Sequence, residues 1–298
     1  MSASYYGRPV VKPHVWKPYI PLYFWIGGTA GAAAVSMALE RAKGNDELAT
    51  VQRNVALAGA LTAPVLLILD LGVPLRFYAM LRVFKPSSPM SIGSWVLTAF
   101  GGAIAGATVS DVLGAKPLAR ALEVVAAALG PVLATYTAVL IADTATPVWR
   151  EARGELPFVF VASSLAGAGA CGTLFAPAAS ARPARRMMTA GAFALAATTR
   201  LMEKRLGRFM AEPYRKGPAA SLKGGADFLS IAGGVLMRAG GKKTVVARVA
   251  AVCVIAAGVL ERFAVLSAGK VSAGDPKYTV EPQRKRADER ASADAVRN

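Results

Sequence analysis

Histidine, cysteine and charge are all scarce in this chain of 298 residues. Its one histidine is His14, and its two cysteines, Cys171 and Cys253, lie apart inside apolar runs. None of them has a spacing that would hold an iron–sulfur cluster or a structural zinc. A membrane protein that carries electrons on b-type haem usually needs paired axial histidines within its helices. We therefore expect no haem, no iron–sulfur cluster and no metal site in this chain.

Charged residues make up 18% of the sequence and hydrophobic residues 54%, which is a membrane composition. The net charge of +17 does not indicate nucleic-acid binding, because the basic residues alternate with apolar runs and no basic, aromatic-interleaved soluble domain is present. Contact with membrane lipid and the orientation of loops explain these cations better. The N-terminus lacks a short hydrophobic core with a cleavage site, so we expect no cleaved signal peptide.

The sequence contains eight apolar runs; seven of them come close to the roughly 20 residues that cross a bilayer as a helix, and the seventh in order, 226–239, is weak. The expected spans are residues 19–39, 54–71, 92–113, 122–145, 156–176, 187–206, 226–239 and 245–266. The sequence thus predicts an all-α, polytopic membrane bundle with both termini on one side. Residues 1–18 form a polar N-terminal segment, 19–266 the membrane domain, and 267–298 a polar tail that is expected to be disordered beyond Pro282. Short turns separate the spans, among them the charged stretch 40–47 and the basic loop 207–223.

The charge distribution gives a modest preference for orientation. The side of the termini carries more Lys and Arg than the other side, even without the last tail residues. By the positive-inside rule, this favours cytoplasmic termini in the cell inner (cytoplasmic) membrane.

Ionisable groups inside the expected spans gather on the side of the termini. Asp70 ends the second span and is followed at once by a Gly-Pro break and a short amphipathic segment, 75–84, that suits a helix on the membrane surface. Tyr136 and Asp143 are seven residues apart in the fourth span and so share one helix face. Further groups on this side are Tyr19, Tyr23, Arg200, Glu203, Lys204, Asp227, Glu261 and Arg262. Charges in hydrocarbon are costly, and such a cluster therefore predicts a functional site.

A quinone is one molecule that such a cluster suits. It is lipid-soluble, needs a donor at a carbonyl oxygen and needs a route for two protons; tyrosine supplies the donor and a carboxylate accepts the proton. Asp70, Asp143, Arg200 and Glu203 are the candidates for a proton relay. Simpler roles stay open: Tyr136 as a helix-interface tyrosine, Arg200 and Glu203 as a salt-bridged helix end, and Asp143 bonded to a neighbouring threonine.

Several motifs occur together along the chain. They are residues 16–24 (WKPYIPLYF), 70–77 (DLGVPLRF), 86–91 (PSSPMS), 136–137 (YT), 147–149 (PVW), 156–157 (LP) and 275–280 (DPKYTV). With these motifs the chain resembles the NrfD/PsrC membrane subunits of polysulfide-reductase-type molybdoenzymes, most strongly over residues 16–170.

The resemblance implies eight packed helices without haem and a menaquinone site near the face that docks an iron–sulfur, ferredoxin-like subunit. A molybdopterin catalytic subunit would complete the complex. The quinone-binding tyrosine of the family corresponds to Tyr136, and the acid at the end of its second helix corresponds to Asp70. Some members place an asparagine and a histidine early in the first helix, where this chain has Ile20 and Tyr23. Tyr136, Tyr23 and Asp70 are accordingly the expected quinone-binding residues.

Our hypothesis is a non-catalytic, quinone-reactive subunit of a respiratory oxidoreductase. Without haem, electrons do not cross the membrane through it, so quinone and the partner's cluster must meet on one face. A proton-coupled transporter is an alternative, disfavoured because the sequence shows no internal repeat and its acids gather at one face. A structural anchor without a working quinone site is a second alternative, kept open because the early histidine is missing.

Overall fold

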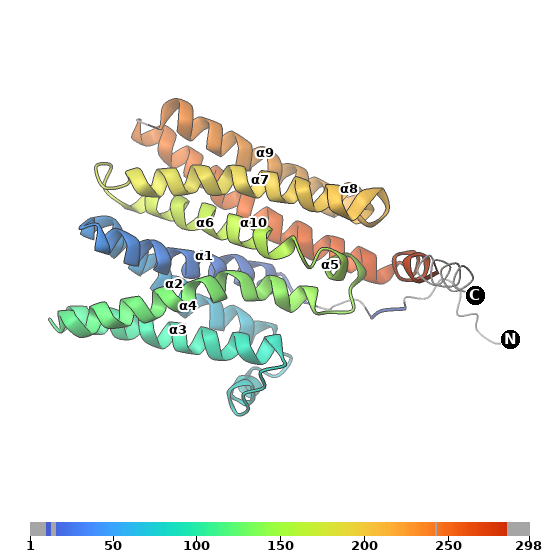
Figure 1. The fold of residues 1–298 in the computed structure, drawn as a ribbon, viewed down its shortest axis with the longest axis horizontal. Helices are drawn as coiled ribbons and strands as arrows, with labels where there is room; N and C mark the ends of the chain where they lie inside the picture. Colours follow the sequence, from blue (N-terminus) through green and yellow to red (C-terminus); the bar gives the residue numbers. More distant parts are fainter. Residues whose placement is uncertain (1–9, 13–15, 242, 285–298) are drawn as a thin grey trace, which may run out of the picture.

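The computed structural model describes residues 10–12, 16–241 and 243–284, and within them every regular element is a helix (Figure 1). His14 and the tail residues 285–298 lie outside this part. The long helices are α1 (Tyr19–Ala42), α2 (Asp46–Asp70), α3 (Pro89–Val112), α4 (Lys116–Ala142), α6 (Leu156–Phe175), α7 (Arg182–Met210), α9 (Gly217–Gly240) and α10 (Thr244–Gly274). The short ones are η1 (Pro74–Leu81), α5 (Pro147–Glu151) and α8 (Glu212–Arg215).

Successive long helices run in opposite directions along one bundle (Figure 1). As a result, α1 begins and α10 ends at the same end, which we call the terminal end; the other is the opposite end. Helix α6 lies in the middle and packs against α1, α2 and α4 on one side and against α7 and α10 on the other. Helices α3 and α9 form the two outer edges in Figure 1. The bundle thus has a first half, α1–α4, and a second half, α7–α10, joined through α6.

The predicted class, a polytopic helical membrane bundle, is confirmed. Six of the described helices, α1, α2, α3, α4, α6 and α10, are long and apolar enough to cross a membrane. Helices α7 and α9 are of similar length but do not meet the same requirement for apolar composition; α7 is rich in charged residues, and α9 contains the weak seventh run of the sequence. The count of eight spans therefore stays a prediction.

Charged segments that the sequence predicts as loops are mostly helical in the structure. The predicted loop over 40–47 narrows to residues 43–45, because α1 continues to Ala42 and α2 begins at Asp46. The predicted basic loop 207–223 contains α8 and the first turns of α9. At the ends of a bundle, charged side chains reach water or an ion partner while their backbone stays helical. Hydropathy therefore marks where the apolar run ends and misses the end of the helix.

Small residues let the central helices approach closely. A Cβ atom added to Gly130 of α4 would lie 2.5 Å from the carbonyl oxygen of Gly31 in α1. The two backbones thus touch at this crossing, which is how helices pack in a membrane without a hydrophobic driving force between them. Gly31 of α1 and Gly130 of α4 therefore permit this close crossing.

Candidate functional site

Tyr136 lies at the terminal end of α4, and its side chain is 7% exposed. The ring lies directly against Gly93 of α3, where an added Cβ would overlap the ring carbons. Its hydroxyl is buried and has no hydrogen-bond partner among the described residues. Most buried side-chain polar atoms are hydrogen-bonded, because an unpaired one loses its water without compensation. The Tyr136 hydroxyl is therefore a free donor held inside the bundle.

Tyr23 of α1 belongs to the same hydrophobic cluster as Tyr136 and is 3% exposed. Its ring centroid lies 5.7 Å from that of Phe24, which in turn lies 6.2 Å from Phe160 of α6. The two predicted tyrosines thus reach one apolar region at the terminal end, lined by aromatic rings. An apolar, aromatic environment with a few polar donors suits a lipid-soluble ring.

Asp70 is the last residue of α2, and its carboxylate is partly exposed. It accepts a hydrogen bond of 2.9 Å from the backbone N–H of Lys17, just before α1 begins. The backbone then turns extended at Leu71 and enters η1, the short surface helix that the sequence predicted. Asp70 therefore joins the start of α1 to the end of α2, within reach of water.

The other predicted relay residues do not converge on Tyr136. Asp143, at the C-cap of α4, is exposed, and the neighbouring Thr144 hydroxyl donates to the Ile141 carbonyl at 2.7 Å. Arg200 of α7 is exposed, whereas Glu203 is buried in the second half. Among the described residues no ion pair joins Arg200 to Glu203, so the salt bridge that the sequence left open as a simpler role for these two does not form.

Glu203 instead forms its ion pairs with residues that follow α7. Lys223 Nζ lies 2.5 Å from Glu203 and 2.9 Å from Asp227, and Arg215 lies 3.6 Å from Glu203. Helices α7 and α9 are thus joined by a buried ionic cluster at the terminal end. Its acids are matched by cations, which is how charges persist in a bundle of this kind.

A buried ion pair lies in α10, between Glu261 and Arg262. The sequence predicted that both residues lie at the terminal end, but it did not indicate which helix they contact. Arg262 is 1% exposed; it donates to the adjacent Glu261 and, at 3.1 Å, to the backbone carbonyl of Phe160 in α6. Its guanidinium carbon lies 3.6 Å from the centroid of the Phe160 ring. Nearby, the buried hydroxyl of Tyr214 in α8 has no hydrogen-bond partner among the described residues. The sequence signal for this pair is two adjacent residues of opposite charge within the long apolar run 245–266.

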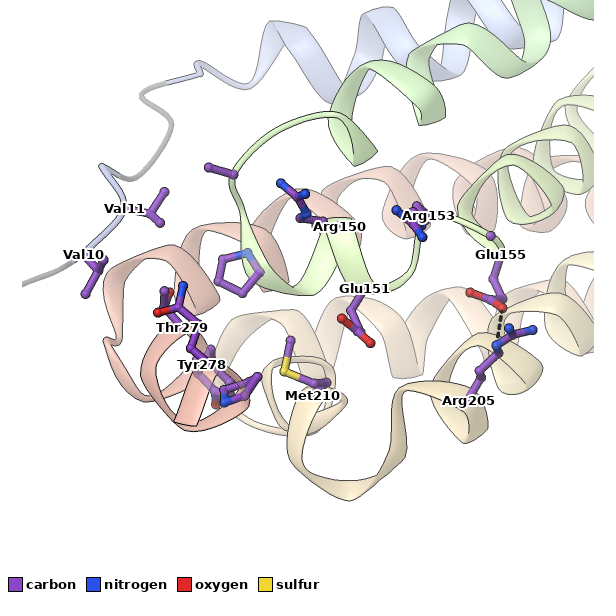
Figure 2. A pocket seen from close by; sticks show the side chains of 15 residues that line it. Val10, Val11, Arg150, Glu151, Arg153, Glu155, Arg205, Met210, Tyr278 and Thr279 are labelled. Carbon is purple, nitrogen blue, oxygen red and sulfur yellow. Dashed lines mark ion pairs between the residues drawn. The ribbon is translucent and has the colours of Figure 1, made fainter. Parts of the chain in front are cut away.

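A cleft of about 860 Å³ opens at the terminal end, beside these groups rather than around Tyr136 (Figure 2). Figure 2 shows it between α5, the end of α7, the N-terminal segment and the chain beyond α10. Its charged lining residues are Arg150, Glu151, Arg153, Glu155 and Arg205. Glu155 and Arg205 form an ion pair of 3.1 Å, drawn as a dashed line in Figure 2. Tyr23, Asp70 and Tyr136 do not line this cleft.

The wall of the cleft beyond α10 is fixed by one carboxylate. Glu212 of α8 lies 2.6 Å from Lys216 Nζ and 2.9 Å from Lys277 Nζ, and it accepts a hydrogen bond of 3.1 Å from the Tyr278 hydroxyl. Hydrogen bonds from Lys216 and then Lys277 lower the pKa of Glu212 to about 2. Glu212 thus stays ionised at neutral pH and holds the segment after α10 against α8.

Among the described residues, no group of three or more His, Cys, Asp or Glu side chains is placed to hold a metal ion. Comparison with known families gives one match: a family model described as polysulphide reductase, NrfD, covers residues 10–202. Tyr23, Asp70 and Tyr136 lie inside the matched region, whereas the Glu261–Arg262 pair lies outside it. A search of curated proteins finds no match.

Proposed function

The chain belongs to the NrfD polysulphide reductase family, and from this premise we propose that it is the haem-free, quinone-reactive membrane subunit of a respiratory oxidoreductase complex. The multi-pass helical bundle supports a membrane subunit of a polysulfide-reductase-like complex. In this proposal its substrate is menaquinone or menaquinol, and its redox partner is an iron–sulfur, ferredoxin-like subunit. A molybdopterin catalytic subunit completes the complex in the cell inner membrane, with cytoplasmic termini of the chain.

The observation that carries the proposal is the buried, unpartnered hydroxyl of Tyr136. It would supply the hydrogen bond that a quinone carbonyl requires. The absence of a side chain at Gly93 leaves room for the Tyr136 ring, which packs directly against the Gly93 backbone. The aromatic cluster around Tyr23 offers the apolar surface that a quinone ring needs. The residues present therefore fit this substrate class.

Menaquinol oxidation releases two protons and two electrons; the electrons pass to the cluster of the partner and the protons to water at the terminal end. Asp70 is the proposed first proton acceptor, since it is a partly exposed carboxylate at the end of α2. Asp143 is exposed and is a second candidate. Glu203 is held by Lys223, so a relay through Glu203 would require that ion pair to open. Arg200 is exposed on α7 and would act only by attracting anions.

The cleft at the terminal end supports a docking site for the iron–sulfur subunit on the same face. Arg150, Arg153 and Arg205 are exposed around it and would attract an acidic segment of the partner. Without haem, electron exchange requires the cluster and the quinone to lie on one face, and the cleft and Tyr136 both belong to the terminal end. This juxtaposition favours a redox subunit over a transporter.

The test is quinol-linked turnover of the complex purified in mild detergent, with three variants of this chain. Tyr136→Phe removes only the donor, and we expect it to lower turnover by at least about tenfold, because a positioned proton-transfer group typically contributes about 10²–10⁴-fold. Tyr214→Phe is the matched control, since it also removes a buried, unpartnered tyrosine hydroxyl at the terminal end. It should leave turnover unchanged. Asp70→Asn should slow turnover while the amount of copurified menaquinone stays the same.

Four outcomes decide between the alternatives. Loss of turnover in Tyr136→Phe with normal subunit assembly supports the proposed donor. Unchanged turnover in that variant removes the role of Tyr136, and unchanged turnover in all variants with no copurified quinone would favour a structural anchor. If the chain purifies without any oxidoreductase subunit, the redox proposal is wrong.

A further inference from the structure

The two halves of the bundle differ in how their charges are balanced at the opposite end. In the first half, α1–α4, each cation there has an acidic partner. Glu123 of α4 accepts two hydrogen bonds from Arg41 of α1, at 2.8 and 3.2 Å. Further pairs in this network include Arg53–Asp111 (2.7 Å), Lys116–Asp111 (2.6 Å), Lys43–Glu40 (3.2 Å) and Arg120–Glu123 (3.3 Å). This network neutralises the end of the first half.

The second half has cations at this end and no acid to match them. The sequence contains no Asp or Glu between Leu156 and Met202, and none between Phe228 and Leu260. Among the described residues, five exposed cations lie there, which we call the basic collar: Arg182, Arg186, Arg238, Lys243 and Arg248. Because these stretches lack carboxylates, no acid within them neutralises the collar.

The collar residues belong to three helices that meet at one corner. The collar spans the start of α7, the end of α9 and the start of α10. Arg185 of α7 donates a hydrogen bond of 2.9 Å to the carbonyl of Gly241, in the turn between α9 and α10. This bond holds the start of α7 beside that turn. The five charges are therefore concentrated on one part of the bundle.

Exposed apolar side chains lie next to the collar on the same helices. In α10, Arg248 has Val245 and Val252 at the i−3 and i+4 positions, which place them on its own face. They are 73% and 57% exposed, and neighbouring Val249 is 50% exposed. In α9, Val235 lies three residues before Arg238 and is 51% exposed. A cation above a row of exposed valines matches a molecule with an anionic head and an acyl chain.

We propose that the basic collar binds the headgroups of anionic phospholipids, with the acyl chains lying on the exposed valines of α9 and α10. The site sits where a helix end reaches the headgroup layer, and basic clusters at that depth bind anionic lipid. The first half, whose cations are neutralised, does not bind in this way. The inference concerns the lipid surface of the chain and holds whichever reaction the complex carries out.

The experiment measures lipid binding to the full-length chain in mild detergent by native mass spectrometry. Phosphatidylglycerol and phosphatidylcholine with the same acyl chains are compared, and inorganic phosphate is a third probe. The collar variant carries Arg238→Gln and Arg248→Gln. The control variant carries Lys116→Gln and Arg120→Gln, which removes two cations at the same end from the neutralised half and leaves exposed Leu118 beside them.

We expect the collar variant to bind phosphatidylglycerol on the order of tenfold more weakly than the unmodified chain, since each cation near an anionic surface contributes severalfold. The control variant should retain its affinity, and phosphatidylcholine should bind all three proteins equally. Equal weakening in both variants would show a general charge effect and overturn the site. Equal binding of the two lipids, or competition by inorganic phosphate at the same concentration, would also overturn it. Intrinsic tryptophan fluorescence confirms that each variant is folded.

Discussion

Removing one partner of the Glu261–Arg262 pair should destabilise the bundle strongly. Both side chains are buried within α10, and Arg262 also donates to the Phe160 carbonyl of α6 and covers the Phe160 ring. Glu261→Gln leaves the guanidinium buried without its counter-ion. Breaking a buried ion pair in this way costs about 3–5 kcal/mol of the free energy of unfolding. Arg262→Met should cost a similar amount, because it leaves a buried carboxylate and an unpaired carbonyl.

The double variant distinguishes the net contribution of the ion pair from the cost of leaving one buried charge without its partner. Replacing both charges by uncharged groups of similar volume leaves no unmatched charge, and such replacements are often neutral in other proteins. Glu261→Gln with Arg262→Met should therefore cost less than either single change. The exposed pair is the control: Arg205 is 77% exposed beside Glu155, and surface pairs contribute only about 0–1 kcal/mol. Arg205→Gln should have a correspondingly small effect.

The assay is equilibrium unfolding of the chain in detergent micelles, followed by the fluorescence of its four tryptophans. The free energies of the two single variants, the double variant and Arg205→Gln form one series. If Glu261→Gln costs less than about 1 kcal/mol, the pair behaves like a surface pair. If the double change costs as much as both single changes together, the two charges are independent. Either result would refute the reasoning.

Three further predictions follow from single contacts. Gly130→Val should destabilise by about 1–3 kcal/mol in the same unfolding assay, because its side chain meets the Gly31 carbonyl, whereas Gly102→Ala, with no atom within 4 Å, should not destabilise. Gly93→Ala should displace the Tyr136 ring and lower quinol-linked turnover with normal assembly; unchanged turnover would contradict the role of that contact. The pKa of Glu212 is lowered to about 2, so its contribution is complete above its unfolded value near pH 4.5 and is lost as the pH falls toward 2. Pepsin should accordingly cleave after residue 274 faster at pH 2 than at pH 4, and Glu212→Gln should abolish that difference.

The helical membrane fold was predictable because hydropathy and length act locally. Each apolar run coincides with one long helix, although the run 122–145 continues beyond the end of α4 at Ala142, and the Gly-Pro break after Asp70 correctly marked the end of α2. The helix ends were less predictable, since they depend on ion pairs between segments. Arg41 stays helical beyond the apolar run while its guanidinium binds Glu123, which lies 82 residues further along the chain.

For the candidate site, the sequence predicts at which end of the bundle each residue lies, but it does not predict which residues they pair with. The positions of Tyr23, Tyr136 and Asp70 at the terminal end follow from counting spans, and the structure places them there. The sequence left an Arg200–Glu203 pair open, but Glu203 pairs with Lys223 of α9, whose packing against α7 no local pattern reveals. The same holds for Arg262, whose carbonyl partner Phe160 is 102 residues away in sequence.

Two buried tyrosine hydroxyls without partners lie at the terminal end, and their surroundings separate them. The Tyr214 hydroxyl lies in the second half, near the Glu261–Arg262 pair, outside the region that matches the family. The Tyr214 hydroxyl interacts electrostatically with the charged Glu261 side chain, so no ligand is needed to explain why it is buried there. The Tyr136 hydroxyl lies in an apolar, aromatic cluster against the bare backbone of Gly93. There an unpaired donor is costly unless a group with an acceptor binds it, and under the proposed function a quinone carbonyl would be that acceptor for Tyr136.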